Sequence, residues 1–446
     1  MKKLLLTVLL LILPALAQAE ATVQDLLAVY RQALASDPVW ASAQSANLAT
    51  QEKQVQGRAL TLPSATLSAN ANHAQTNVRY NGGSIFKSGG HERFETYGYS
   101  VNLSHPLYRK QNSIQYEQSK TQVAQAAEQM DEVRQELMLR VSQAYFDVLL
   151  AQDRIDLIAA QKSAIGRQLE QAQANFEVGT ATITDVHEAQ ARFDLTVAQE
   201  VAALNDLESK KRVIQSLTGQ FHERLAGAGA PVRVALPEPL DMEKWVEIAE
   251  QGNRALKIQL QALDLANQEI ERTKAGHLPT LDVVGNYSDT RSNGGVNGFG
   301  SDLKNFTVGL QFELPLYAGG AISSREREAV ANRQRALDDV ENARRQAGLA
   351  ARQAYLGVSS TVAQVKALEQ ALASSQSQLD STSLGYEVGV RTSVDVLNAQ
   401  QQLYNAKYDL QQARYAYLVG TIRLKAAVGT LQENDLDEAN RKLSGS

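Results

Sequence analysis

Two Thr-x-x-Asp motifs contain the acidic residues whose type and spacing indicate a defined chemistry. They occupy residues 182–185 and 392–395, and a glycine, Gly179 or Gly389, stands three residues before each threonine. A threonine hydroxyl and a carboxylate three residues later can satisfy each other's backbone N–H groups in a capping box, which stabilises a helix start by about 1 kcal/mol. Glycine is the usual residue just past a helix end. Each motif therefore predicts a tight turn between two helices.

The sequence shows no catalytic motif and no motif for binding a metal or a cofactor. The chain has no cysteine, which excludes disulfides, thiol catalysis and an acylated N-terminal cysteine. No two histidines stand at the spacing of metal ligands, and no glycine loop of the Walker or dinucleotide type is present. We therefore expect no enzymatic activity, no metal site and no cofactor. The six histidines are His73, His91, His105, His187, His222 and His277.

The first nineteen residues have the pattern of a secretory signal peptide. Lys2 and Lys3 precede an apolar stretch at 4–13, and Ala-Gln-Ala at 17–19 is a small-residue cleavage site. We expect the mature chain to start at Glu20. No later window approaches the roughly 18 to 20 apolar residues that a membrane helix needs, so a membrane crossing after export would have to use strands.

The charge and composition narrow the class of partner and of fold. Once Lys2 and Lys3 are removed from the 44 basic residues, the 49 acidic residues are in excess by about seven, so nucleic acid is not an expected partner. Aromatic residues make up only 6% of the chain, while Ala, Gln and Leu are abundant. This composition is typical of long helices rather than of a compact globular core.

The chain contains the same unit twice. Residues 143–220 and 353–430 align without a gap at an offset of 210. The sequence Phe-Glu-Val-Gly before the first turn corresponds to Tyr-Glu-Val-Gly before the second. Two such halves predict a pseudo-symmetric assembly. We expect a first structural repeat at 20–220, a Gly- and Pro-containing linker at 221–240, a second repeat at 241–430, and a polar, frayed tail at 431–446.

Proline positions indicate where long helices can run. No proline occurs in 107–230 or in 316–446, and an interior proline costs a helix about 3 kcal/mol. Each long helix would be roughly 100 Å long at 1.5 Å per residue, with an antiparallel return helix of half that length beside it. A shorter upstream helix would cover the remaining half. The expected helices are 40–60, 110–178, 184–217, 255–276, 321–388 and 394–428.

Four segments alternate apolar and polar residues with the period of a strand. They lie at about 63–77, 94–106, 279–291 and 304–315, as two hairpins joined by glycine-rich loops. The alternation alone is also consistent with a soluble antiparallel sheet that packs one face on a core and exposes the other face to water. Export and the unpaired hairpin edges favour a closed barrel to which several chains contribute, because four strands are too few to close. The residues then expected to face lipid are Tyr97, Tyr99, Val101, Leu103, Phe306, Val308, Leu310 and Phe312.

This order of elements, given twice, resembles the TolC family of outer-membrane channel-tunnels. The resemblance covers essentially all of the mature chain and is carried by the turn sequence Tyr-Glu-Val-Gly-Val-Arg-Thr-Ser-Val-Asp-Val-Leu at 386–397 and by the paired Pro-Leu-Tyr at 106–108 and 315–317. It implies a mainly α fold with a transmembrane β part. It also implies a homotrimer whose twelve-stranded barrel continues into an α-helical tunnel across the periplasm of a Gram-negative bacterium.

The resemblance also implies where the channel closes. In the family the entrance is held by contacts at the helix tips, which correspond here to Thr184, Asp185, Tyr386, Arg391 and Asp395. Family members place a second acid one turn after the last of these. This chain has Asn398 there, which leaves a ring of three carboxylates in place of six.

The residues themselves leave other roles open. Asp185 and Asp395 can be helix caps only, since an acid at the third helical position serves that purpose. Arg391 can be a solvated turn residue, or its planar guanidinium can hold two hairpins together near Thr184 and Asp185.

Two classes of function fit these patterns. The favoured one is a passive outer-membrane exit duct for type I protein secretion or multidrug efflux. Its partners would be a periplasmic adaptor, an inner-membrane ABC, RND or MFS translocase and outer-membrane lipid. The alternative is an exported trimeric coiled-coil adhesin or scaffold. The internal repeat and the return to strand in mid-chain argue against an adhesin, whose stalk places strands at one end.

Overall fold

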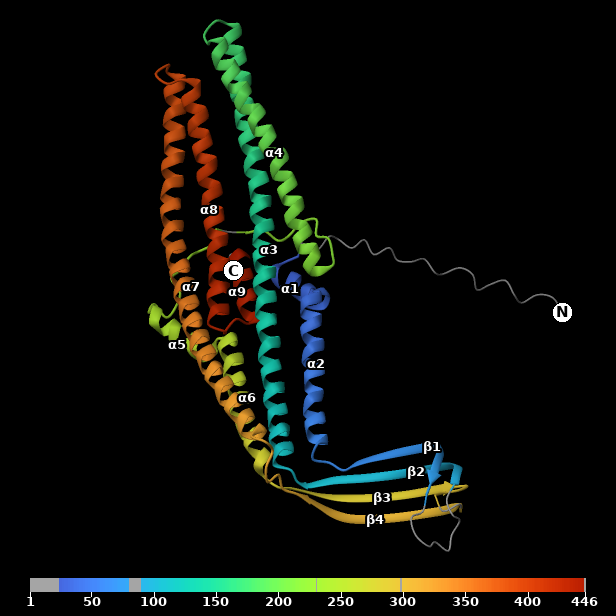
Figure 1. Ribbon diagram of the computed structural model, residues 1–446. Coiled ribbons are helices and arrows are strands. Elements are labelled where there is room, and N and C mark those ends of the chain that lie inside the picture. The colour runs from blue at the N-terminus through green and yellow to red at the C-terminus, as the bar shows by residue number, and fades with distance from the viewer. Residues whose placement is uncertain (1–23, 80–89, 230, 297–298, 445–446) are drawn as a thin grey trace, which may run out of the picture.

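The computed structural model describes residues 24–79, 90–229, 231–296 and 299–444. The signal peptide expected at 1–19 lies outside these residues. The chain is elongated, with a four-stranded sheet at one end and the turns of two helical hairpins at the other (Figure 1). The predicted fold class, mainly helical with a smaller β part and two repeated halves, is confirmed.

Two long helices, α3 (Lys110–Glu177) and α7 (Ala321–Glu387), run most of the length of the molecule. Each folds back at a tight turn into a return helix, α4 (Ile183–Thr218) or α8 (Ser393–Ala427). The return helices pack along one half of their long partners, and α8 also packs against α3. The two hairpins of the chain therefore touch each other directly.

Two shorter helices cover the other half of the long ones. Helix α2 (Pro38–Ala59) packs on α3, while α6 (Arg254–Lys274) lies against both α3 and α7. The Asp37 carboxylate accepts a hydrogen bond of 2.8 Å from the Trp40 N–H and caps α2. A proline is the first residue of this helix, where its missing N–H costs nothing.

The strands form one antiparallel sheet in the order β1 (Ser64–Val78), β2 (Gly90–Tyr108), β3 (Thr280–Ser292) and β4 (Ser301–Glu313). The two predicted hairpins are therefore joined by pairing of β2 with β3. Strands β1 and β4 are the two edges. Across the sheet the register aligns Leu67, Val101, Tyr287 and Phe306 on one face, and Ser68, Ser100, Ser288 and Asn305 on the other.

The apolar face of the sheet is exposed in the single chain. The eight side chains expected to face lipid are all exposed, from 39% for Val101 to 74% for Phe306. On the opposite face the Asn286 amide donates a hydrogen bond of 2.7 Å to the Asn102 carbonyl oxygen. One face of the sheet thus suits an apolar surrounding and the other suits water.

The main core lies at mid-length, where three short helices pack on the long ones, the first and the last of them against α3 and the middle one against α7. They are α1 (Leu26–Ser36), α5 (Met242–Gly252) and α9 (Glu433–Ser444), none of which the sequence predicted. The linker also contributes, because Leu225 and Val232 are buried there. The largest fully buried side chains of this core include Tyr30, Tyr145, Phe146, Leu418 and Leu436.

The expectation of a frayed C-terminal tail is wrong. Most of the tail is α9, which packs against α1, α3 and α8. Leu436, Ala439 and Leu443 recur at helical spacing and are buried, while charged residues cover the opposite face. The tail is polar in composition but amphipathic in pattern, and the pattern determines its structure.

Candidate functional site at the hairpin tips

The two tips share one turn geometry. Gly179 and Gly389 have φ of +78° and +79°, in the left-handed region that favours glycine. In the first turn the Asn175 carbonyl accepts from two N–H groups five and six residues later, at 2.8 and 3.2 Å. In the second turn the Gly385 carbonyl accepts from the equivalent groups at 2.9 and 3.1 Å.

Both predicted capping boxes are confirmed. The Asp185 carboxylate accepts from the Thr182 N–H at 2.9 Å, and the Thr182 hydroxyl accepts from the Asp185 N–H at 3.3 Å. Thr392 and Asp395 repeat both bonds at 3.0 and 3.2 Å. These bonds from the Thr392 backbone and hydroxyl hold the pKa of Asp395 below its usual value, and the Arg391 cation adds to the effect.

The residues expected to form the gate lie on different hairpins of the chain. The Tyr386 hydroxyl accepts a long hydrogen bond of 3.4 Å from the Asn175 side-chain amide, which joins α7 to α3. The aliphatic part of Arg391 covers Gly385 so closely that a β-carbon added to this glycine would lie 2.7 Å from Arg391 Cγ. Within the described residues of one chain, no hydrogen bond or ion pair joins Arg391 to Thr184 or Asp185.

Arg192 is a tip residue that the sequence analysis missed. Its guanidinium donates to the Asn398 side-chain oxygen at 3.0 Å, and its Nε lies 3.5 Å from a carboxylate oxygen of Glu188 on the same helix. It therefore connects α4 with α8 at the position where the family's second acid is replaced. The spacing of Glu188 and Arg192 predicts an intrahelical ion pair. This spacing does not predict the contact with Asn398, which is 206 residues away in the chain.

Further from the tips, polar contacts continue to join the two hairpins. The Gln161 amide donates to the Gln401 side-chain oxygen at 2.7 Å. The Asp153 carboxylate accepts from the Tyr415 hydroxyl at 2.7 Å and from the Gln411 amide at 3.3 Å. Burial raises the pKa of Asp153 although both hydrogen bonds act in the opposite direction. An apolar cluster lies between these polar contacts and the turns. It contains Ile165, Ala172, Ala189 and Leu397.

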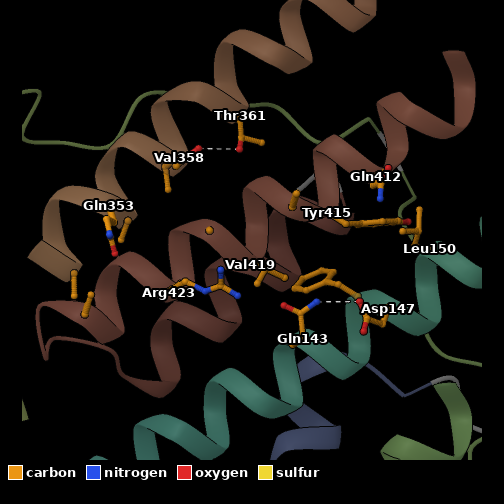
Figure 2. Close-up of a pocket in the computed structure, with 17 residues that line it drawn as sticks. Gln143, Asp147, Leu150, Gln353, Val358, Thr361, Gln412, Tyr415, Val419 and Arg423 are labelled. Carbon is orange, nitrogen blue, oxygen red and sulfur yellow. Dashed lines mark hydrogen bonds between the residues drawn. The ribbon is translucent and has the colours of Figure 1, made fainter.

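A groove of about 580 Å³ lies between the two hairpins near the main core (Figure 2). Side chains of α3, α7 and α8 line it, among them Gln143, Asp147, Gln353, Tyr415 and Arg423. They mix amides, single charges and small apolar groups. In the parts of the chain that the structure describes, no three His, Cys, Asp or Glu side chains gather as a metal site would require.

The free ends of the hairpins expose apolar side chains. At the first tip these are Phe176, Val178 and Ile183, and at the second tip Leu384, Val388 and Val390, the last of them 75% exposed. Small exposed apolar groups gathered on a protruding end mark a candidate contact surface for another protein.

None of the helices within 24–79, 90–229, 231–296 and 299–444 combines the length and the apolar character of a membrane span.

Comparison with known proteins assigns the chain to a family. The family model for outer membrane efflux proteins matches residues 29–220 and 245–430, one segment in each structural repeat. The chain is 33% identical to the outer membrane protein TolC of Vibrio cholerae serotype O1 over 422 residues, which cover 94% of either chain. It is 31% identical to the alkaline protease secretion protein AprF of Pseudomonas aeruginosa, covering 95% of this chain and 88% of that one.

The fold agrees with that of solved outer-membrane channels. The outer membrane protein VceC from Vibrio cholerae superposes with a TM-score of 0.76 at 19% identity, covering 91% of this chain and 96% of that one. A trimeric barrel assembly is consistent with this family, and the protein is located in the outer membrane with a periplasmic extension. With both halves matched and with relatives above 30% identity along nearly the whole length, the chain belongs to the outer membrane efflux protein family.

Proposed function

We propose that this protein is an outer-membrane exit duct for type I protein secretion and multidrug efflux, gated at the hairpin tips. The observation that carries the proposal is the sheet with one apolar exposed face and one polar face, directly continuous with long helical hairpins. Relatives whose names refer to TolC, to protease secretion and to efflux support the same class of transport. The duct itself is passive, and an inner-membrane partner supplies the energy.

Three copies form the duct in this proposal. Within the described residues, strands β1 and β4 of each chain have one edge without a partner strand, and unpaired backbone groups cannot remain exposed in lipid. Pairing of β4 with β1 of the next copy satisfies both edges. Three chains of four strands then close a twelve-stranded barrel whose apolar face meets lipid.

The gate is formed by contacts between neighbouring chains. Arg391 lies on an exposed turn and makes no ion pair within the described part of its own chain. In the proposed assembly its guanidinium reaches Thr184 and Asp185 of the next copy, where a planar fork can donate to both a hydroxyl and a carboxylate. Tyr386 adds a contact within its own chain, the hydrogen bond of 3.4 Å that its hydroxyl accepts from Asn175.

The exposed tips are the proposed docking surface for the partner proteins. Val178 and Val390 belong to the turns that follow α3 and α7, and these turns lie at the end of the molecule opposite the sheet, so a periplasmic adaptor that covers them can bind without entering the membrane. The adaptor links the duct to an inner-membrane ABC, RND or MFS translocase. Binding at the tips acts on the same residues that hold the gate.

Fractionation and bilayer conductance test the duct against the adhesin alternative. The duct should be extracted from the outer membrane with detergent and should conduct ions in planar bilayers. An adhesin would give no conductance. A detergent-soluble, properly folded protein that never conducts would contradict the proposed function.

The double variant Tyr386→Phe with Arg391→Ser tests the gate. Removing these contacts should shift the closed-to-open equilibrium, and a shift of a few kcal/mol is enough to change the open population greatly. Single-channel conductance should rise, and cells should admit large antibiotics. Arg212→Ala is a matched control, because Arg212 lies at the end of α4 away from the tip, where it pairs with Glu208 and Gln215 of its own helix and stacks on the Phe221 ring. Unchanged conductance in the double variant would leave Tyr386 and Arg391 with a turn-forming role only.

A further inference from the structure

We infer that the groove between α3, α7 and α8 is a binding site for amphipathic organic anions in the wall of the duct. The inference rests on the proposed function, because it names a class of compound that the duct contacts during passage. The volume of the groove is about 580 Å³. Small-molecule sites typically measure about 300 to 1,000 Å³. The groove is therefore too large for a single ion and too small for a folded protein.

The groove lies on the face of the long helices that the short helices leave uncovered. Arg352 of α7 pairs with Glu243 of α5 at 2.8 Å. Gly357 and Thr361 of α7 line the groove. They follow Arg352 by five and nine residues, which places them about 140° and 180° from it around the helix. The groove therefore opens on the side of α7 opposite to α5.

The same geometry holds on α8. Lys425 pairs with Asp435 of α9 at 2.6 Å. Arg423 and Ala416 line the groove and stand about 160° and 180° from Lys425 around the helix. Helix α8 packs between α3 and α7. The groove and the short helices thus occupy opposite sides of one layer of helices.

The groove side of this layer faces the interior of the proposed duct. At each level one chain contributes four described helices, α3 and α7 with either α2 and α6 or α4 and α8, so three copies form a ring of twelve. With about 10 Å between helix axes, this ring has a radius of about 19 Å and a clear interior radius of about 14 Å. Short helices about 10 Å thick on the inside of every copy would obstruct this space. They therefore lie outside, and the groove lies inside.

Two glycines keep the groove open. Gly357 of α7 and Gly420 of α8 both line it. A β-carbon added to Gly357 would have no neighbour within 4 Å in the described chain, and one added to Gly420 would meet the Val358 side chain at 3.4 Å. Packing within the described chain therefore requires neither glycine, although glycine is a weak helix former. What the two glycines provide is open space.

The equivalent positions of the first hairpin are filled. At the repeat offset of 210 residues, Gly357 corresponds to Asp147 and Gly420 corresponds to Lys210. These two side chains form an ion pair of 3.5 Å between α3 and α4. One copy of the repeated unit is therefore bridged by a charged pair at this level, and the other copy is left open.

The groove carries one uncompensated positive charge. Its charged lining residues are Asp147 and Arg423. The Asp147 carboxylate pairs with Lys210 and accepts a hydrogen bond of 2.9 Å from the Gln143 amide. Arg423 is exposed and makes no ion pair within the part of the chain that the structure describes. Figure 2 shows its guanidinium directed toward Gln143. This planar fork can donate two hydrogen bonds to a carboxylate or a sulfonate.

The remaining lining favours an apolar ring system. The Phe146 and Tyr415 rings stack with their centroids 5.8 Å apart. The Tyr415 hydroxyl donates to Asp153, so the ring presents carbon to the groove. A compound with an acidic group at Arg423 and its hydrocarbon part along α8 satisfies both features. A cationic compound has no equivalent partner, because Asp147 is already paired.

Calorimetry with two matched probes tests the site. The full chain in phosphatidylcholine nanodiscs should bind naphthalenesulfonate, with one site per chain. Naphthyltrimethylammonium has the same ring and the opposite charge, and it should bind at least about ten-fold more weakly because it cannot accept from Arg423. Empty nanodiscs give the blank. Equal binding of the two probes, or no binding of either, would overturn the inference.

Two variants remove the site in different ways. Arg423→Gln removes the charge and should weaken binding of naphthalenesulfonate about ten-fold or more. Gly357→Asp with Gly420→Lys copies the ion pair of the first hairpin into the groove and should abolish binding, while melting curves check that the protein is folded. Arg345→Gln is the matched control, because Arg345 lies on α7 outside the groove and pairs with Glu341 of its own helix. Natural affinity in the Arg423→Gln protein would contradict the inference.

Chemical modification tests which side of the wall the groove faces. The natural chain has no cysteine, so one introduced thiol reacts alone. Gln353→Cys places it in the groove, and Lys244→Cys places it on the exposed surface of α5. A polyethylene glycol maleimide attached at position 353 should lower the single-channel conductance, because the polymer occupies the duct. The same polymer at position 244 should leave it unchanged. The reverse result would place the groove outside the duct and sink the inference.

The binding and conductance measurements distinguish a failure of this site from a failure of the duct. A protein that conducts but does not prefer the sulfonate overturns the inference and leaves the proposed function standing. Sulfonate binding that Arg423→Gln weakens supports the site even in a folded preparation that never conducts. That preparation would contradict the duct.

Discussion

A single carboxylate at each tip can serve both the local fold and the passage of ions. Asp395 accepts hydrogen bonds from the Thr392 backbone and hydroxyl, which accounts for its lowered pKa. A lowered pKa means that the ionised form stabilises the folded state. This contribution is complete above the ordinary value of 3.8 and is lost as the pH falls through the lowered value.

Asp395→Asn should therefore reduce thermal stability modestly at neutral pH and leave it unchanged at a pH below the lowered pKa. Thermal melting curves of the variant and the natural protein at the two pH values test the capping role of Asp395. If three copies of Asp395 also line the mouth, the same variant should weaken cation preference, because fixed carboxylates attract cations into a narrow pore. Reversal potentials under a salt gradient measure that preference. A lower melting temperature with an unaltered reversal potential would mean that Asp395 is only a helix cap.

The effect of Asn398→Asp on cation preference should depend on Arg192, which contacts the side chain at this position. A carboxylate introduced by Asn398→Asp would accept from the guanidinium that now donates to the amide at 3.0 Å. The new charge would be largely compensated, so cation preference should rise only slightly. In the Arg192→Gln background the same change should raise it clearly. Equal shifts of the reversal potential in both backgrounds would show that Arg192 does not compensate position 398.

At the scale of single elements, local signals were sufficient to predict the long helices and the capping boxes. Helix ends depend on residues within one turn, so Gly179 with the Thr182 box, and Gly389 with the Thr392 box, indicated both turns. Alternation likewise indicated the strands, because each has one apolar and one polar face.

Elements and contacts that depend on distant residues were not predictable in the same way. Helix α9 is charged in composition and gains its stability by burying Leu436 and Leu443 against helices from the start and middle of the chain. The bond from Arg192 to Asn398 exists only because α4 and α8 converge at their tips. No local pattern contains either fact.

The two faces of the sheet should respond differently to charge. Val101→Lys and Leu310→Lys place a cation on the exposed apolar face and should impair membrane insertion by about 2 to 4 kcal/mol near the bilayer midplane. Ser100→Lys and Gln311→Lys are matched controls on the neighbouring positions of the same strands and should be tolerated. Heat-resistant folded protein in outer-membrane fractions measures insertion. An equal loss in all four variants would show that the assignment of the faces is wrong.

At the scale of the whole molecule, the open sheet requires partners. Four strands with two free edges cannot enclose a pore, so a stable detergent-solubilised particle should contain three chains. Light scattering with correction for bound detergent gives the protein mass directly. A folded, conducting monomer would contradict the proposed trimer.

The two ends of the chain meet in the main core, and this governs how the protein can fold. The Leu26 N–H donates to the Asn440 side-chain oxygen at 3.1 Å, across 414 residues of sequence, and α1 packs against α9. Contacts of such separation form late, because the whole intervening chain must be confined before they are gained. The core therefore cannot close until the last helix has been synthesised and exported. Until then the apolar side chains of the core remain exposed, so the chain depends on chaperones and is sensitive to proteases.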